Sequence, residues 1–261
     1  MRRAIIPVML VAIMAAALLP GCNMGSLGKI ISADKDFTNF TTVDIEDEFD
    51  VKIVQSSSFK VTISADESFF DYITVSKTGD TLRIYLNPRH AFTDFTVGTK
   101  NLRVEISMPA LYGLRLSGAT RATITGFKSS DIFNLDISGA SSLDMNKIET
   151  GDAKLVISGA SKISGDMKAA NTIFEVSGAS KVTLKGSGTN ADLNVSNASN
   201  ANLADFIIDT ADVTLTEASQ ATVNVKERLD CVVNAASTLY FLGNPTTGNV
   251  QVSGASSIKH R

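Results

Sequence analysis

Apolar and polar residues alternate along several short stretches between residues 37 and 112. The clearest runs are residues 43–45, 49–53, 59–63, 82–86 and 102–106. A period of two is typical of strands that bury one face and expose the other. Turn-forming pairs such as Gly79-Asp80 separate the runs. Residues 37–112 are therefore predicted to form an N-terminal β region.

From Leu114 onward the alternation becomes a repeat of about twenty residues. Successive copies start 21, 20, 19, 19, 20, 18 and 19 residues apart. A repeat of this length, with short strands and no helical period, predicts a β-solenoid whose stacked coils build one core. We expect an all-β fold with about eight coils over residues 113–261. The region of residues 37–112 either forms a separate domain or continues into the solenoid. The copies are LRLSGAT (114–120), LDISGAS (135–141), LVISGAS (155–161), FEVSGAS (174–180), LNVSNAS (193–199), VTLTEAS (213–219), CVVNAAS (231–237) and VQVSGAS (250–256).

The columns of the repeat predict which side chains face inward. The first and third positions are almost always apolar, whereas the second varies freely and should face water. The fifth position is Gly in five copies, as expected at a bend. The sixth is Ala in all eight, and an unvaried small residue predicts a crowded inward corner.

The first residues predict export. Arg2 and Arg3 precede an apolar run from Ala4 to Leu19, which is the pattern of a secretory signal peptide. The run ends at Leu19-Pro20-Gly21-Cys22, which resembles the lipobox of bacterial lipoproteins. We therefore predict a signal peptide over residues 1–21, acylation of Cys22 as a membrane anchor, and a tether over residues 22–36.

Composition excludes several classes of function. The net charge of −3 argues against nucleic acid as a partner, since phosphate binding requires a basic surface. With two His, and only Cys231 besides Cys22, neither a metal site nor an internal disulfide is predicted. No cofactor is predicted either. Cys231 occupies an inward column and should be a buried, inert thiol.

The Ser residues at the fourth and seventh repeat positions do not predict a catalytic site. A Ser nucleophile needs a base within hydrogen-bond reach, and His260 is the only His in the repeats. Their hydroxyls are expected to bond the backbone at the bends and the adjacent coils. A sugar-cleaving enzyme on this scaffold would need clustered carboxylates, and we expect no acidic column to persist across adjacent coils.

One long segment between predicted strands is a candidate binding element. Residues 88–100 carry His90, Phe92 and Phe95. Long loops in compact domains are often functional, and exposed aromatic residues mark interaction sites. The alternative is that the two Phe side chains cover the open end of the solenoid.

The lipobox, the strand from Phe49 to Val54 and the tandem L-x-[IV]-S-G-A-S copies together resemble the family called putative auto-transporter adhesin, head GIN domain, whose members are common in Bacteroidetes. The resemblance covers residues 38–261. It implies a right-handed, single-stranded β-helix and an exported protein, and it brings no catalytic residues. In copies five to seven the chain departs from the Ser-Gly pair.

These observations favour a non-enzymatic cell-envelope lipoprotein that serves as an adhesion or ligand-binding module. Its partners would be the membrane, through the lipid anchor, and a carbohydrate or protein ligand or a second copy of the chain. The alternatives are a carbohydrate-active enzyme (a polysaccharide lyase or hydrolase) and a structural envelope spacer. Residues 23–26 carry no acidic run of the kind associated with surface export, which favours the periplasmic face of the outer membrane over the cell surface.

Overall fold

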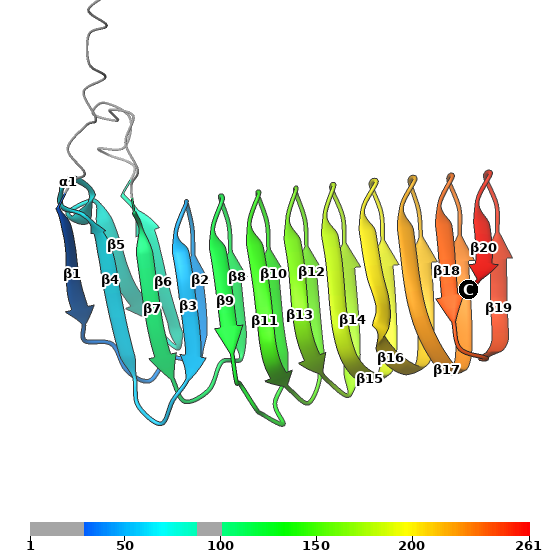
Figure 1. Cartoon of the computed structure of the whole chain (residues 1–261), viewed down its shortest axis with the longest axis horizontal. Helices are drawn as coiled ribbons and strands as arrows, with labels where there is room; N and C mark the ends of the chain where they lie inside the picture. Colours follow the sequence, from blue (N-terminus) through cyan, green and yellow to red (C-terminus); the bar gives the residue numbers. More distant parts are fainter. Residues whose placement is uncertain (1–28, 88–100) are drawn as a thin grey trace, which may run out of the picture.

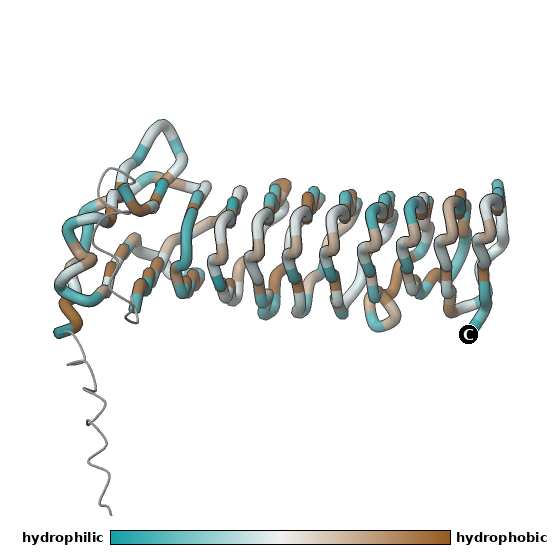
Figure 2. Tube along the Cα trace, turned by 90° about the horizontal axis from the view of Figure 1, so that it is seen from above, coloured by the Kyte–Doolittle hydropathy of each residue, from teal (hydrophilic) through white to brown (hydrophobic). Residues whose placement is uncertain are grey.

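The computed structural model describes residues 29–87 and 101–261. This part of the chain consists almost entirely of strands, with one short helix, α1 (Glu67–Phe70). The strands stack side by side into an elongated rod whose coils turn sharply at one edge (Figure 1). Seen from above, the rod has two rows of strands with a narrow interior between them (Figure 2). The prediction of a β-solenoid is therefore confirmed.

Each repeat copy spans the end of one strand, a tight turn and the start of the next strand. Strands on the same side of the turn pair in parallel from coil to coil, so that Leu135 lies opposite both Leu114 and Leu155. The first layer, before the turns, contains β8 (Gly113–Leu116), β10 (Phe133–Ile137), β12 (Ala153–Ile157), β14 (Asn171–Val176), the second halves of β15 (Lys181–Val195), β16 (Asn200–Leu215) and β17 (Gln220–Val233), and β19 (Thr246–Val252). The second layer, after the turns, contains β9 (Arg121–Thr125), β11 (Ser142–Glu149), β13 (Lys162–Lys168), the first halves of β15, β16 and β17, then β18 (Thr238–Leu242) and β20 (Ser257–His260).

The N-terminal strands extend the same two layers. β2 (Thr42–Ile45) lies in the first layer between β8 and β6 (Thr81–Leu86), and β3 (Asp50–Gln55) lies in the second between β9 and β7 (Arg103–Met108). The coil formed by β2 and β3 is thus enclosed by later parts of the chain on both sides.

Antiparallel strands close the N-terminal end of the stack. β5 (Ile73–Thr78) pairs with β6, β4 (Lys60–Asp66) pairs with β7, and β1 (Ile30–Lys35) pairs with β4. The predicted tether over residues 22–36 is therefore wrong in its second half, because residues 30–35 form β1. In β1, half-buried residues alternate with exposed ones, which is the pattern of a strand with one face against the rest of the protein.

The core confirms the inward columns of the repeat. The first and third positions are at most 2% exposed in copies one to seven. The large side chains of Phe40, Phe49, Phe174 and Phe206 are fully buried and fill the interior. Copy eight differs: Val250 and Val252 are 44% and 48% exposed, because within residues 29–87 and 101–261 no further coil lies against them.

The prediction for the Ala column is wrong. Ala140, Ala160 and Ala179 are exposed, whereas the following Ser141, Ser161 and Ser180 are buried. The Gly-Ala pair forms the tip of a two-residue turn and projects from the edge of the stack. The residue after the tip is therefore the one that enters the interior.

The turns have two geometries. In copies one to four the Gly has a φ of +73° to +82° and the Ala does not have a positive φ. In copies five to eight both central residues have φ values between +52° and +62°. These are the patterns of type II′ and type I′ turns, which differ by rotation of the central peptide.

The rotation reverses the hydrogen bonds that link the turns. Ala160 N–H donates back to Gly139 O of the preceding copy (2.7 Å), whereas Ala218 N–H donates forward to Ala235 O of the next (2.8 Å). A Cβ atom on Gly139 would lie 2.4 Å from Gly118 O, but one on Gly254 would lie 3.0 Å from Ala235 N. Only the first geometry therefore requires Gly, which explains why copies five to seven depart from Ser-Gly.

Candidate functional site

The residues that the sequence marks as candidate sites are not among those that the structure describes. Cys22 precedes residue 29, and His90, Phe92 and Phe95 fall between residues 87 and 101. Acylation of Cys22 and the binding or capping role of the 88–100 segment stay predictions. The structure instead draws attention to the outer face of the first layer.

A groove of about 490 Å³ runs over that face, across β6, β2, β8, β10 and β12. We call it the first-layer groove. Its lining is mostly polar and comes from both the N-terminal region and the repeats. The lining residues are Thr41, Thr42, Asp80, Thr81, Tyr112, Gly113, Leu114, Arg115, Asn134, Leu135, Asp136, Lys154 and Val156.

Strand alternation places these side chains. Leu114 and Leu135 point inward and are at most 2% exposed, so that their neighbours Arg115 and Asp136 point outward. Gly113 has no side chain, and the side chain of Thr42 from the adjacent strand takes up the space; a Cβ on Gly113 would lie 2.8 Å from it. Gly113 therefore lets the Thr42 side chain lie across its strand.

Charges of alternating sign cross the groove in register. Arg83, Asp44, Arg115 and Asp136 occupy equivalent positions of β6, β2, β8 and β10. Arg83 Nε hydrogen-bonds Glu46 Oε1 at 3.0 Å and lies 3.9 Å from Asp44 Oδ2. Burial is the main cause that raises the pKa of Asp44, followed by the nearby Glu46 carboxylate, while Arg83 and Arg115 oppose the shift.

Three neighbouring side chains in the groove have unused hydrogen-bonding capacity. Within residues 29–87 and 101–261, the side chains of Arg115, Asn134 and Asp136 make no hydrogen bond and no ion pair. Lys154, in contrast, pairs with Glu175 at 2.8 Å, and Asp80 accepts hydrogen bonds from Thr41 and Thr81. The sequence offered a signal for this set, since residues 113, 115, 134, 136 and 154 flank the same inward column in consecutive copies.

Tyr112 stands at the rim of the groove and is held from both sides. Its carbonyl accepts the backbone N–H of Asn134 at 2.8 Å. A hydrogen bond to the Asp131 carboxylate raises the pKa of its phenol, because ionisation would place two negative charges together. The Tyr112 side chain is therefore oriented by Asp131 at the rim of the groove.

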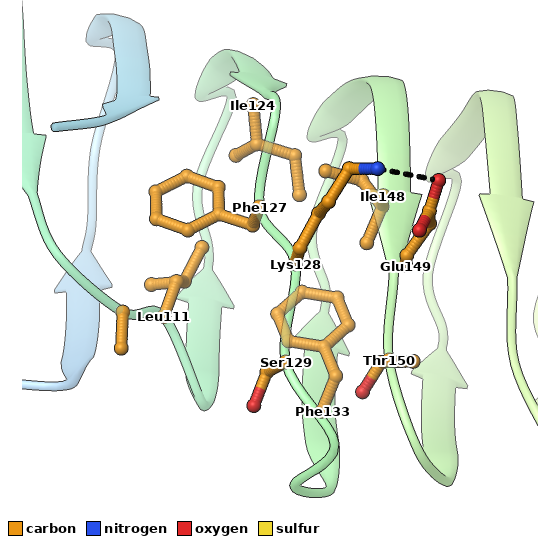
Figure 3. Close-up of a pocket in the computed structure, with 10 residues that line it drawn as sticks. Leu111, Ile124, Phe127, Lys128, Ser129, Phe133, Ile148, Glu149 and Thr150 are labelled. Atoms are coloured by element: carbon orange, nitrogen blue, oxygen red, sulfur yellow. Dashed lines mark hydrogen bonds and ion pairs between the residues drawn. The ribbon is translucent and has the colours of Figure 1, made fainter.

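Two other hollows are less suited to a ligand. One, of about 290 Å³, lies on the second layer between Asp50, Arg121, Asp144 and Lys162. The other is enclosed at the base of the first repeat coil, where Phe127 and Phe133 pack under an ion pair of Lys128 with Glu149 at 3.0 Å (Figure 3). Its free volume of about 10 Å³ has room for about one water.

The Ser columns form a structural array inside the turns. Thr120 Oγ1 donates to Ser117 O at 3.0 Å, Ser219 Oγ donates to Val195 O at 2.9 Å, and Ser237 Oγ accepts the Ser219 N–H at 3.2 Å. These bonds to backbone and to the adjacent coil are the predicted kind. Ser141, Ser161 and Ser180 have buried hydroxyls without a partner among the described residues. In that same part of the chain, no group of three His, Cys, Asp or Glu residues could hold a metal ion.

The expectation that no acidic column persists across coils is wrong. Asp192, Asp212 and Asp230 lie side by side on three consecutive coils of the first layer. Burial, then the negative charges of Asp192 and Asp230, raise the pKa of Asp212. Each Asp directly precedes its repeat copy, so an alignment of the copies extended by one residue shows the column.

Cys231 behaves as predicted. It is 2% exposed, and burial, with smaller contributions from Asp230 and Asp212, raises the pKa of its thiol. A thiol with a raised pKa is largely protonated and is a poor nucleophile.

Comparison with known proteins agrees with the fold. Residues 39–245 match the family model described as putative auto-transporter adhesin, head GIN domain. The chain belongs to this family. No protein with a curated function matches it. Among the described residues, no helix is long and apolar enough to cross a membrane.

Solved structures share the architecture at low sequence identity. A putative lipid binding protein from Parabacteroides distasonis is 15% identical, with a TM-score of 0.82 over 90% of this chain and 97% of that one. A putative adhesin from the same species is 14% identical, with a TM-score of 0.77 over 90% and 98% of the two chains. A putative adhesin from Parabacteroides merdae is 15% identical, with a TM-score of 0.74 over 90% and 97%. At these identities the likeness shows the fold alone.

Proposed function

We propose that the protein is a non-enzymatic binding module of the cell envelope, of the adhesin type. The family model carries an adhesin description, and similar solved structures are described as putative adhesins. The observation that carries the proposal is the first-layer groove, in which the exposed Arg115, Asn134 and Asp136 have no hydrogen-bond or ion-pair partner among the described residues. A rigid sheet face with such groups is suited to recognition of an extended ligand.

The envelope location is part of the same proposal. Cys22, acylated after removal of residues 1–21, would hold the chain to the outer membrane. The N-terminal closed end of the solenoid would then lie near the membrane, with the repeats extending away from it. The periplasmic face is favoured by the neutral sequence after Cys22.

A lipid-binding role is less well supported. One similar structure is described as a putative lipid binding protein, but the interior between the two layers is filled by side chains. The enclosed hollow at Phe127 and Phe133 is too small for an acyl chain.

Binding is tested by applying the purified chain to an array of glycans and extracellular-matrix proteins. We expect retention on at least one class of ligand. Incubation with the retained polysaccharide should release no reducing ends and no unsaturated products. Release of either would establish a carbohydrate-active enzyme, and a failure to bind any glycan or protein would favour the structural spacer.

A further inference from the structure

The first-layer groove lies on a sheet face and not at a sheet edge. β8 is hydrogen-bonded to β2 on one side and to β10 on the other, and β10 continues to β12. Because the backbone groups are used within the sheet, a peptide cannot be bound there by adding a strand. Any ligand in the groove must be recognised by side chains.

The lining offers no apolar pocket into which a protein partner could insert a side chain. Leu114 and Leu135 are buried beneath the surface, and the apolar surface in the open part comes from half-buried Val156 and the half-buried ring of Tyr112. Protein partners usually insert aromatic or aliphatic anchors into desolvated pockets. The hydroxyl, amide, carboxylate and guanidinium groups of this groove match instead the hydroxyl groups of a sugar, which both donate and accept.

The charges of the lining favour an uncharged ligand. Arg115 lies between Asp44 and Asp136 in register, and the Lys154 ammonium is already paired with Glu175. A polyanion would meet the Asp80 and Asp136 carboxylates without a surplus of cations to offset them. A neutral chain meets no such repulsion.

The spacing of the coils favours one orientation of a neutral ligand chain in the groove. Adjacent strands are about 4.8 Å apart, which is close to the length that one pyranose unit adds to an extended chain. A chain lying along the solenoid axis would therefore pass one coil for about each sugar unit.

We propose that the first-layer groove binds a linear neutral polysaccharide that lies along the solenoid axis, across β2, β8, β10 and β12. This inference rests on the proposed binding function and specifies its ligand. Asp136 accepts hydrogen bonds from sugar hydroxyls, Arg115 donates to ring or hydroxyl oxygens, and Asn134 does both. Val156 contacts the apolar C–H face of a ring, and Tyr112 limits one side of the groove.

The test is calorimetric titration of the purified full chain with six linear hexasaccharides. Five are neutral: cellohexaose, laminarihexaose, xylohexaose, mannohexaose and chitohexaose. The sixth, the hexamer of galacturonic acid, is the anionic probe. At least one neutral hexasaccharide should bind, with an affinity that changes less than twofold when salt is raised tenfold.

Matched variants locate the binding. Asn134→Ala and Asp136→Asn should each weaken the neutral ligand at least fivefold. Asn194→Ala changes the same residue type on the same layer outside the groove and should have no effect, and equal melting temperatures would show that all three variants fold. Asp144→Asn probes the hollow on the second layer.

Each alternative result has a distinct meaning. Binding of the galacturonate hexamer alone would overturn the neutral ligand, as would binding weakened by Asp144→Asn and not by the groove variants. If no hexasaccharide binds but matrix proteins are retained on the array, the polysaccharide inference fails and the proposed binding function stands. If nothing binds in either experiment, both fail.

Discussion

Ser180 and Ala179 are neighbours in the sequence with opposite surroundings. The Ala is at the exposed tip of a turn, and the Ser is 2% exposed inside it. Both columns of the repeat contain small, nearly unvaried residues. Strict alternation distinguishes them, because the buried Phe174, Val176, Ser180 and Val182 are separated by even numbers of residues and Ala179 is out of phase with them. The expectation of an inward Ala gave more weight to the unvaried small residue than to this phase.

The two residues should respond differently to the same substitution. Ser180→Leu should destabilise the fold by about 1–3 kcal/mol, since the added side chain overpacks the interior of the turn. Ala179→Leu should change the free energy of unfolding by less than about 0.5 kcal/mol. Chemical denaturation of both variants measures the difference. A larger loss for Ala179→Leu would contradict the observed register.

Asp212 gives a prediction for pH. Its pKa is raised in the folded chain by burial and by the Asp192 and Asp230 carboxylates. The folded state therefore binds a proton at higher pH than the unfolded state, and the group's contribution to stability falls as pH rises from about 4 through the raised pKa. Asp212→Asn should stabilise the chain at pH 7 by less than about 1 kcal/mol, a bound that allows for screening by solvent.

The control is the same comparison at pH 3. There Asp212 is protonated in both states, so the variant should melt at the temperature of the unsubstituted chain. A stabilisation of equal size at pH 3 and pH 7 would show that the carboxylate charge is not its cause.

At the scale of single elements, the turns divide the solenoid into two groups. Gly139 belongs to the first group, in which the carbonyl of the preceding turn points at the Gly. Gly139→Ala should destabilise by about 2 kcal/mol or more, because a positive φ and a close carbonyl act together. Gly254→Ala, in the second group, should cost at most about 1 kcal/mol, since Ala235 already occupies the same position one copy earlier. Thermal unfolding of the pair separates these costs, and similar losses would contradict the two geometries.

The strands of the first layer differ in how deeply they bury equivalent residues. Val213 is fully buried in β16, whereas Val250 at the equivalent position of β19 is 44% exposed. Val213→Ala should cost about 2 kcal/mol through lost burial and a residual cavity. Val250→Ala should cost about half of that or less, as judged by denaturant midpoints. Equal costs would indicate that another surface covers β19 in solution.

The sequence predicted the elements of the repeats better than those of the N-terminal region. Within a copy, the inward positions follow from local alternation, and Leu114, Ile137 and Phe174 are buried as expected. The groove depends on long-range pairing of residues 42–45 with 113–116, which no local pattern encodes. The Asp column could have been predicted from the repeat, whereas the placement of Tyr112 against Asp131 could not.

At the scale of the whole molecule, we predict attachment to the membrane through Cys22. If Cys22 carries the proposed lipid anchor, Cys22→Ser should move the protein from the membrane fraction to the soluble fraction, because Ser has no thiol to acylate. Detergent phase partitioning measures the change. A variant that remains in the detergent phase would place the anchor elsewhere in the chain.

The coil of β2 and β3 lies between other coils on both sides. This position limits where repeats can be duplicated or lost during evolution. Copies two to seven each lie between two coils that pair with them in parallel, so recombination between copies of one turn geometry adds or removes about 4.8 Å of rod while the parallel stacking continues. A duplication of residues 42–55 has no such place, because β6 and β7 already lie on one side and β8 and β9 on the other. Insertions and losses of repeats should therefore accumulate beyond β12, where they leave the groove intact and change only how far the rod extends past it.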